Sequence, residues 1–415
     1  MQGKVASYTA IEQKDAVVYD IGGVKTQYLL NYKKLEMVKF IRPLLMTIFA
    51  VQLLGCNPEK SPNEYPSESL KVKFKILKRG QAILEKEIDH FDGNKIPVGS
   101  VMGLITDDSC IYITDTQQGL VHVLNRNTYH FKRSVGSTAR DTAYIHRPFG
   151  AQFYKGNLIV GHSNINSLFK IFSPSGLFLK DYNSDGISFN GPFAYHLNNF
   201  FINDSIAYVV KLIANNGRKV KRYHLNNSEV TELEDVVPVE DLHANVDSGM
   251  ASKIIPKLFL LKSHVQDTTF FAIPSNKYLV NRYALNSDSL MESMSLLEIP
   301  EMRSSYELNT ISDNSSSGPN TVHYNFFSGA AIDKNDNLYF PVQEIIDFQA
   351  YKSGDDSENN INTYIVAVNL DSKSYSLYQL DRSRAIAPAS FIDGKLWCYD
   401  FVLSRLLVYS LNEKD

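Results

Sequence analysis

Four short stretches of the chain carry side chains that could bind an anion or stack on a ring. Each lies just before a segment with the alternating pattern of a strand: YIHRPFG (144–150), FNGPFAY (189–195), VHYNFFSG (322–329) and RSRAIAPA (382–389). An arginine can hold a carboxylate or a phosphate through two parallel hydrogen bonds, and aromatic rings can stack on a sugar or a peptide. The binding candidates are His146, Arg147, Asn190, His323, Tyr324, Asn325, Arg382 and Arg384. In the structural alternative, His146 and Arg147 satisfy loop carbonyls and Tyr324 packs between strands.

A second chemical feature is Cys56, which ends an apolar run. Lys39 and Arg42 precede residues 43–55, PLLMTIFAVQLLG. This run is shorter than the ~20 residues that a membrane-spanning helix needs, and it matches the apolar region of a secretory signal. Its end, LLGC, resembles a bacterial lipobox, in which the cysteine is acylated and becomes the first residue of the mature chain. The resemblance implies lipidation at Cys56 and a cell-envelope protein anchored to the membrane, with periplasmic or surface display left open. The alternative is a buried helix that ends on a chance cysteine.

The composition of the segments suggests four regions. Residues 1–36 are interpreted as a non-native extension with Met37 as the true start, and residues 37–55 as the signal peptide. Residues 56–69, polar and rich in Pro and Ser, are expected to form a flexible tether. The remainder, 70–415, is predicted to be one large domain.

Overall charge and cysteine content narrow the function further. The net charge of −3 over 415 residues argues against a nucleic-acid partner, since such a protein needs a basic face to replace phosphate counterions. Cys110 and Cys398 could pair in an exported protein. Aligned repeats place them on opposite sides of the pleat, so we expect a free buried thiol at Cys398 rather than a disulfide.

A weak repeat indicates the architecture. DDSCIYITDTQQGLVHVLN (107–125) aligns with IDGKLWCYDFVLSRLLVYSLN (392–412), and the same frame recurs at 154–176, 202–227, 267–288 and 334–373. Each unit closes with an apolar residue followed by a small polar turn residue. Units of about four strands and roughly 40–60 residues have the period of a propeller blade. The sequence therefore predicts an all-β, six-bladed β-propeller; seven blades or two domains are alternatives because 234–325 is hard to divide.

The last unit lacks its outer strand, which must come from elsewhere. The segment 70–88, LKVKFKILKRGQAILEKEI, is strand-like and unassigned. We predict that it completes the last blade and latches the ring. Its alternating lysines, Lys71, Lys73 and Lys75, would protect an outermost strand from edge pairing.

The lipobox, the tether and the six degenerate units together resemble the TolB-like or NHL-like six-bladed propeller lipoproteins of Gram-negative bacteria. The resemblance rests on architecture. In such a ring, one face carries the long connections and the other minimal turns. The long connections here are 136–147, 183–192, 234–258, 299–325 and 343–361. Binding residues tend to lie on loops held by a rigid scaffold, so this face is predicted to bind a ligand, glycan or small molecule, or another envelope protein.

Signals of catalysis are few. The sequence has no G-x-S-x-G, no H-E-x-x-H and no Cys-His metal spacing. Asp115 and Asp400 align with His162, and a His–Asp set of this kind resembles the metal site of calcium-dependent lactonase propellers, but the accompanying Glu and Asn set is not found. SGDDSENN (353–360) lacks ordered calcium-ligand spacing. We therefore expect no metal or cofactor and favour a binding module; the alternative is a hydrolase or lyase acting on a glycan or small ester in the central channel.

Overall fold

The computed structural model describes most of the chain from Val72 onwards, together with three short strands nearer the N-terminus. The residues outside the description after Val72 are 94, 163–167, 183–199, 214–216, 227–228, 234–257, 275–277, 286, 288, 306–327, 346–360, 382–385 and 414–415. Two compact units are present, Met1–Ser67 and Glu68–Asp415. The first contains a three-stranded antiparallel sheet of β1 (Ile11–Gln13), β2 (Ala16–Ile21) and β3 (Val24–Leu29).

The second unit contains four antiparallel sheets of four strands each, formed by β7 to β22. Sheet 1 comprises β7 (Val101–Thr106), β8 (Cys110–Asp115), β9 (Leu120–Asn125) and β10 (Phe131–Val135). Sheet 2 comprises β11 (Pro148–Tyr154), β12 (Asn157–His162), β13 (Phe169–Phe172) and β14 (Phe178–Tyr182). Sheet 3 comprises β15 (Phe200–Asn203), β16 (Ile206–Ile213), β17 (Gly217–His224) and β18 (Val230–Leu233). Sheet 4 comprises β19 (Leu258–Lys262), β20 (Thr269–Pro274), β21 (Leu279–Ala284) and β22 (Leu290–Ser295).

The remaining strands form one eight-stranded sheet, ordered β23-β24-β25-β26-β4-β29-β28-β27. Half 5 comprises β23 (Ala331–Ile332), β24 (Asn337–Ile345), β25 (Ile361–Asn369) and β26 (Ser374–Leu380). Half 6 comprises β27 (Ile386–Ile392), β28 (Lys395–Asp400), β29 (Arg405–Glu413) and the N-terminal strand β4 (Lys75–Ile88). A two-stranded ribbon of β5 (His90–Phe91) and β6 (Ile96–Pro97) follows β4, and a short 3-10 turn, η2 (Leu296–Glu298), follows β22.

The strand β4 closes the last group, as the sequence predicts. It pairs antiparallel with β29, from Gly80 opposite Glu413 to Ile88 opposite Leu406. The predicted role of its lysines is wrong, because β4 is not an edge strand. Its first half also pairs in parallel with β26, from Lys75 opposite Ser374 to Ala82 opposite Leu380. Two groups of strands therefore share β4 as a common outer strand.

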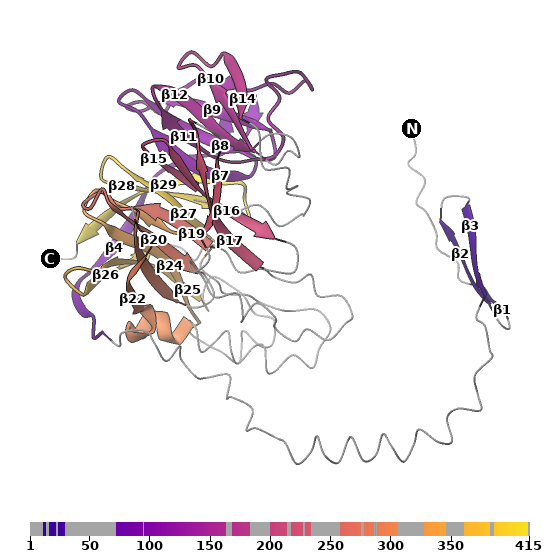
Figure 1. Ribbon diagram of the computed structural model, residues 1–415. Helices are drawn as coiled ribbons and strands as arrows, with labels where there is room; N and C mark the ends of the chain where they lie inside the picture. The colour runs from indigo at the N-terminus through magenta and orange to yellow at the C-terminus, as the bar shows by residue number, and fades with distance from the viewer. Residues whose placement is uncertain are drawn as a thin grey trace, which may run out of the picture. The chain divides into compact units, whose positions relative to one another are not determined.

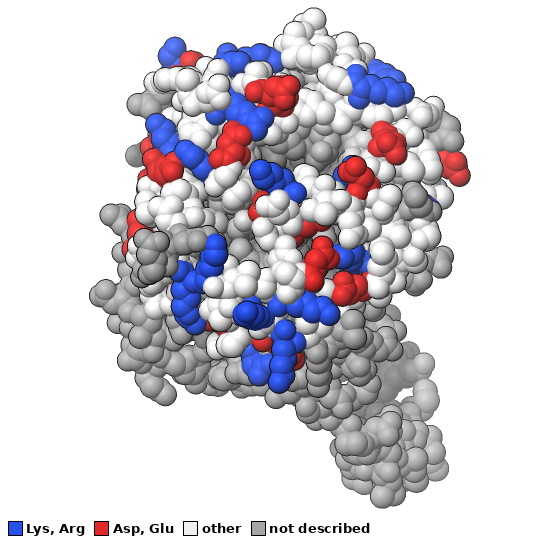
Figure 2. All heavy atoms as spheres, turned by 90° about the vertical axis from the view of Figure 1, so that its left-hand side faces the viewer, with Lys and Arg blue, Asp and Glu red and all other residues white. Residues whose placement is uncertain are grey.

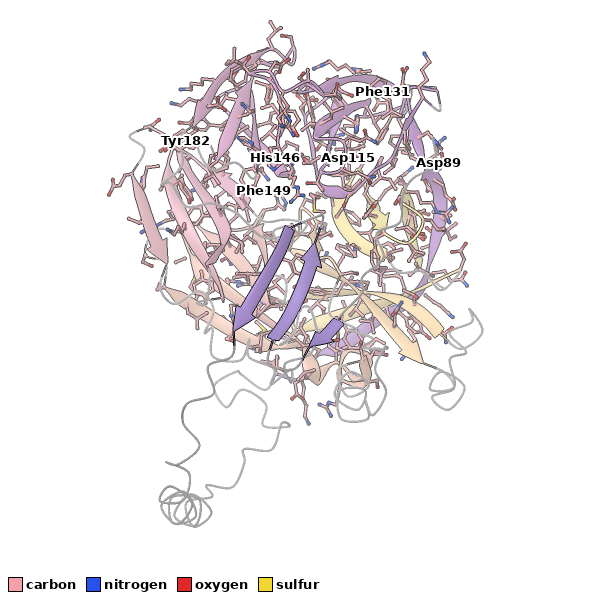
Figure 3. All side chains as sticks on the ribbon, turned by 90° about the vertical axis from the view of Figure 1, so that its right-hand side faces the viewer. Asp89, Asp115, Phe131, His146, Phe149 and Tyr182 are labelled. Atoms are coloured by element: carbon pink, nitrogen blue, oxygen red, sulfur yellow. The ribbon has the colours of Figure 1, made fainter. Side chains whose placement is uncertain are left out.

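Buried side chains on both faces of each sheet join the sheets into a ring (Figures 1 and 3). In β8, Ile111 and Ile113 belong to a core cluster that also holds Trp397 of β28, whereas Tyr112 packs in a second cluster with Leu158 of β12. Successive residues of a strand point to opposite faces, so one strand contributes to two interfaces. Burying a large apolar side chain stabilises the fold by about 1.5–3 kcal/mol.

The interfaces run completely around the ring. Three further clusters join sheets 2 and 3, sheets 3 and 4, and halves 5 and 6. The largest cluster joins Phe259 of sheet 4 to Phe340 of half 5, and Trp397 of half 6 to Ile111 of sheet 1. The protein is therefore an all-β propeller. Apart from β1 to β3 and the ribbon of β5 and β6, the described strands fall into six groups of four. A blade number of six stays a prediction, which this order supports.

The two faces of the ring differ in their connections. The turn face carries the hairpins 107–109, 155–156, 204–205 and 393–394, and the loop face carries 116–119, 136–147 and 401–404. Figure 2 shows the turn face. In Figure 1 this face is on the left, where β29 ends at the C-terminus. Most of the predicted long connections, with the signal peptide, tether and Cys56, lie outside the described residues. Within the described part of the chain, no helix has the length and apolar character to cross a membrane.

The two described cysteines are free and buried. Cys398 packs between halves 5 and 6, whereas Cys110 packs between sheets 1 and 2. This separation agrees with the predicted opposite orientations. Burial raises the pKa of the Cys398 thiol well above its ordinary value.

Candidate functional site

Three sheets share one construction where the second strand meets the start of the innermost strand. Asp115 pairs with Val101, His162 with Pro148, and Asp400 with Ile386. The register shifts immediately after the first two pairs, and between Pro388 and Ser390 in half 6. The sequence alignment of these three positions is confirmed. They lie on the loop face, at the ends of β8, β12 and β28.

Asp115 is fully buried and its carboxylate is occupied by the backbone. It accepts hydrogen bonds from the amides of Gly99 at 2.7 Å, Ser100 at 3.1 Å, and Gln117 and Gln118 at 3.0 Å each. Burial raises its pKa, but the His122 imidazole, whose Nε2 lies 3.7 Å from the carboxylate, and the amides of Gln118 and Gly99 outweigh burial, so the net pKa is lowered. Asp115 is therefore a structural acid that fixes the turn after β8.

Asp400 has the same structural role in half 6. Its carboxylate accepts from the amides of Val402 at 3.0 Å and Leu403 at 2.9 Å. Of the His–Asp set suggested by the sequence, Asp115 and Asp400 hold turns, and His162 is a buried histidine. Among the described residues, no group of three or more His, Cys, Asp and Glu side chains is arranged to hold a metal ion.

Sheet 2 and the loop before it gather cationic groups at the loop face. His146 is half-buried and Arg147 is exposed, with a positive φ of 50° that sets the chain's entry into β11. The Thr116 hydroxyl donates to the Pro148 carbonyl, which fixes the start of β11 against the turn after β8. Figure 3 shows His146, Asp115 and Phe149 close to the centre of the ring. His146, one of the two predicted binding residues that the structure describes, therefore lies toward the centre of the ring, and Arg147 follows it in the chain.

The electrostatics of this cluster favour an anion. Burial lowers the pKa of His146, and the charges of Arg147 and Arg140 lower it further. Burial also lowers the pKa of His162 to about 4, with contributions from Lys170 and His146 and an opposing one from Asp181. Both imidazoles are therefore neutral near pH 7, because burial disfavours the charged form and neighbouring cations add to this effect. We call His146, Arg147, Arg140, His162 and Lys170 the cationic cluster.

Lys170 is the buried member of this cluster. Its ammonium donates to the Asp181 carboxylate at 2.7 Å and to the Thr142 carbonyl at 2.8 Å. The second bond ties β13 to the loop 136–147. Lys170 is therefore neutralised by Asp181. Arg140 and Arg147 are exposed on the loop.

The other predicted site residues lie outside the described part of the chain: Asn190, His323, Tyr324, Asn325, Arg382 and Arg384. The residues that follow two of these stretches do meet. The Ser328 hydroxyl donates to the Ile386 carbonyl, and Gly329 lies so close to Pro388 that a Cβ there would be 2.4 Å from its carbonyl oxygen. The chain after 322–327 therefore adjoins the chain after 382–385.

Sequence reasoning missed an exposed apolar turn on the same face. Phe401, Val402 and Leu403 are 49%, 68% and 56% exposed. Asp400 holds the backbone of this turn through the amides of Val402 and Leu403. The signal was present in the sequence as three apolar residues between Asp400 and Ser404, where the equivalent turn 116–119 is polar.

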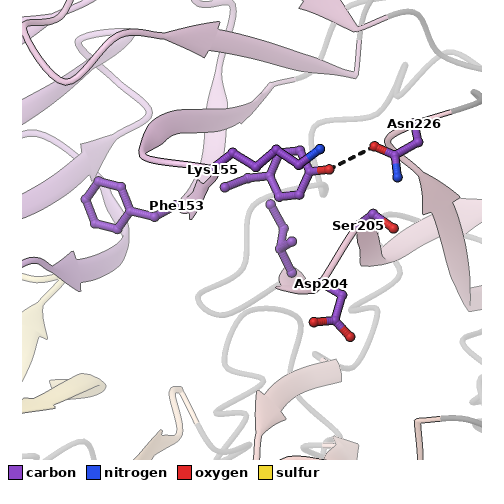
Figure 4. A pocket seen from close by; sticks show the side chains of 7 residues that line it. Phe153, Lys155, Asp204, Ser205 and Asn226 are labelled. Atoms are coloured by element: carbon purple, nitrogen blue, oxygen red, sulfur yellow. Dashed lines mark hydrogen bonds between the residues drawn. The ribbon is translucent and has the colours of Figure 1, made fainter.

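The turn face has a hollow of ≈400 Å³ between sheets 2 and 3 (Figure 4). Its lining is Phe153, Tyr154, Lys155, Ile202, Asp204, Ser205 and Asn226. The Tyr154 hydroxyl donates to the Asn226 side-chain carbonyl at 3.0 Å, and Lys155 and Asp204 are exposed. The hollow is shallow and its polar groups are satisfied or solvated, so it is a seam between two sheets.

Comparisons with known proteins identify no family for this chain. No protein-family model matches the chain, and no curated protein matches it. Similar solved structures include streptogramin B lyase, with 13% identity, TM-score 0.43, and coverage of 80% of this chain and 98% of that one. A luciferin-regenerating enzyme has 13% identity, TM-score 0.44, and coverage of 79% and 95%. The Cps50 (Swd1) β-propeller domain of Myceliophteria thermophila has 7% identity, TM-score 0.41, and coverage of 80% and 100%. The assignment to the propellers rests on the strand order and packing above.

Proposed function

We propose that this protein is a lipid-anchored propeller of the cell envelope that binds a carboxylate- or phosphate-bearing ligand at its loop face. The observation that carries the proposal is the cationic cluster. Arg140 and Arg147 are exposed there, and their charges add to the effect of burial in lowering the pKa of His146. A bound anion would relieve this repulsion, and an arginine can hold its oxygens bidentately.

The apolar turn 401–403 supports the further proposal that the ligand belongs to another envelope protein. Hot spots of protein interfaces combine arginines with well-packed aromatic and apolar anchors. The loop face offers an apolar turn with Phe401 at its start and exposed arginines at the cationic cluster. A partner with an acidic group and an apolar pocket would match both.

The test of ligand binding is an NMR titration of His146 with inorganic phosphate or succinate at constant ionic strength. We expect either anion to raise the pKa of His146, because a nearby negative charge favours the imidazolium. Arg147→Ala should weaken the anion's effect, whereas Lys155→Ala, on the turn face, should not. If neither anion changed the pKa of His146, the proposal would be contradicted.

Lipid anchoring at Cys56 is tested separately. Metabolic labelling with an alkyne fatty acid should label the protein and place it in the membrane fraction. Cys56→Ser should lose the label and be released. A labelled Cys56→Ser variant, or a precursor that retains residues 1–36, would contradict the assigned signal.

A second candidate function rests on the state of His146. A neutral imidazole beside Arg147 could act as a general base with a cation near a developing oxyanion. The corresponding proposal is a hydrolase or lyase acting on a glycan or small ester. Turnover of a panel of nitrophenyl esters and glycosides, abolished by His146→Ala with the fold intact, would support it over binding alone.

A further inference from the structure

The strand β4 changes charge along its length. Residues 72–80 contain Lys73, Lys75, Lys78 and Arg79 and no acid, whereas residues 81–89 contain three acids and one lysine. The basic end lies at the turn face, since Lys75 pairs with Ser374, directly after the turn that leads into β26. The acidic end lies toward the loop face, where Ile88 pairs with Leu406.

Two apolar side chains are exposed within the basic end. The register between β4 and β26 shifts at Tyr375 and Ser376, so that Leu77 has no opposite residue. Leu77 is 56% exposed and Ile76 37% exposed. Lysines on either side, Lys75 and Lys78, are exposed as well. Apolar side chains flanked by lysines suit an interface with headgroups, where the aliphatic stems lie along the apolar region and the ammonium groups reach the phosphates.

Among the described side chains, neighbouring elements add one lysine, together with two acids that are paired with arginines. Lys373, in the turn before β26, is exposed and its carbonyl accepts from the Lys75 amide at 2.9 Å. Glu301 lies 3.3 Å from Arg79, which keeps 67% of its side chain exposed. Asp371 pairs with Arg282 at 2.7 Å. Figure 2 shows Lys and Arg side chains in the lower part of this face, with Asp and Glu side chains among them, and others across its upper part.

We propose that this basic foot, Lys73–Arg79 with Lys373, contacts an anionic lipid surface and directs the loop face away from the membrane. The inference rests on the proposed anchor at Cys56, because the chain from Cys56 enters the propeller at this point. A tether of residues 56–71 could reach ~55 Å when extended, so it leaves the orientation of the propeller open. A basic, partly apolar contact beside the tether would fix it, since stable membrane attachment commonly combines a lipid with a basic patch.

The experiment uses the full chain as Cys56→Ser, so that no lipid contributes. Its partition is measured on vesicles of phosphatidylcholine alone and with about 30 mol% phosphatidylglycerol. We expect binding only to the anionic vesicles, weakened by salt. The triple variant Lys73→Gln, Lys75→Gln, Lys373→Gln should bind roughly a hundredfold more weakly, and Leu77→Ser should also lose affinity.

The matched control removes three exposed lysines elsewhere: Lys95→Gln, Lys155→Gln, Lys180→Gln. It should retain most of the binding, and thermal melting should show both variants folded. Equal loss in the two triple variants, equal binding to neutral vesicles, or no binding at all would overturn the inference. Because lipid labelling at Cys56 is a separate assay, failure of the anchor and failure of the foot are distinguishable.

Discussion

Asp115 is the residue whose substitution should most clearly separate structure from function. Asp115→Asn removes a buried charge that four backbone amides stabilise. We expect the free energy of unfolding to fall by about 2–4 kcal/mol at pH 7, as measured by urea denaturation. The folded pKa is lowered, so this contribution is present above the unfolded pKa and is lost as pH falls through the folded value.

Asp393→Asn is the matched control for Asp115→Asn. Asp393 is 46% exposed and pairs with Arg126 on the surface, and such pairs contribute about 0–1 kcal/mol. If the two variants were equally stable, Asp115 would not have the structural role assigned to it.

His162 should make the propeller sensitive to mild acid. Its folded pKa of about 4 lies below its ordinary value of 6.5, so the unfolded state takes up the proton first. Stability is complete above pH 6.5 and should decline by about 3 kcal/mol as pH falls toward 4. His162→Gln should flatten this decline in urea unfolding measured across the range. An unchanged slope in His162→Gln would refute the assignment.

At the scale of elements, Gly80 is where β4 is most sensitive to change. A Cβ on Gly80 would lie 2.2 Å from the Asn412 carbonyl oxygen and 2.9 Å from the Tyr378 ring. Gly80→Ala should therefore separate β4 from both partner strands and reduce the free energy of unfolding by about 2 kcal/mol or more. Gln81→Ala, exposed on the same strand, should change it by less than about 0.5 kcal/mol. Deletion of residues 70–88 removes β4 altogether and should destabilise the whole domain. If the truncated protein melted at the same temperature as the full chain, this segment would not latch the ring.

The strands and their order could be predicted because the inner strands are buried on both faces, as in β8. Such strands read as short apolar runs between polar turns. The parallel pairing of β4 with β26 could not be predicted from the sequence, because it depends on the register of two strands about 300 residues apart. His146 and Arg147 were identifiable because they precede the innermost strand of sheet 2. The turn 401–403 was missed because apolar residues are normally assigned to the core, and only the fold exposes them.

At the scale of the whole molecule, the ring should unfold as a unit. Cys110 and Cys398 lie in different interfaces and report on opposite parts of the chain. Because each sheet supports both neighbours, loss of one interface should remove the others. The experiment starts from Cys56→Ser protein and adds either Cys110→Ser or Cys398→Ser, so that each variant keeps one of the two thiols. The remaining thiol should become reactive to a maleimide at the same urea concentration in both variants. Labelling of one well before the other would show separate subdomains.

The double pairing of β4 also has a mechanical consequence. A pull on the chain ahead of Lys75 acts along the strand, at the end where its parallel ladder with β26 begins. Ladder hydrogen bonds lie across the strands, so such a load shears many of them together and does not open them one at a time. Under force, detachment would be governed by the rate of unfolding rather than by equilibrium stability. The strand through which a membrane tether would enter is thus the one built to resist traction from it.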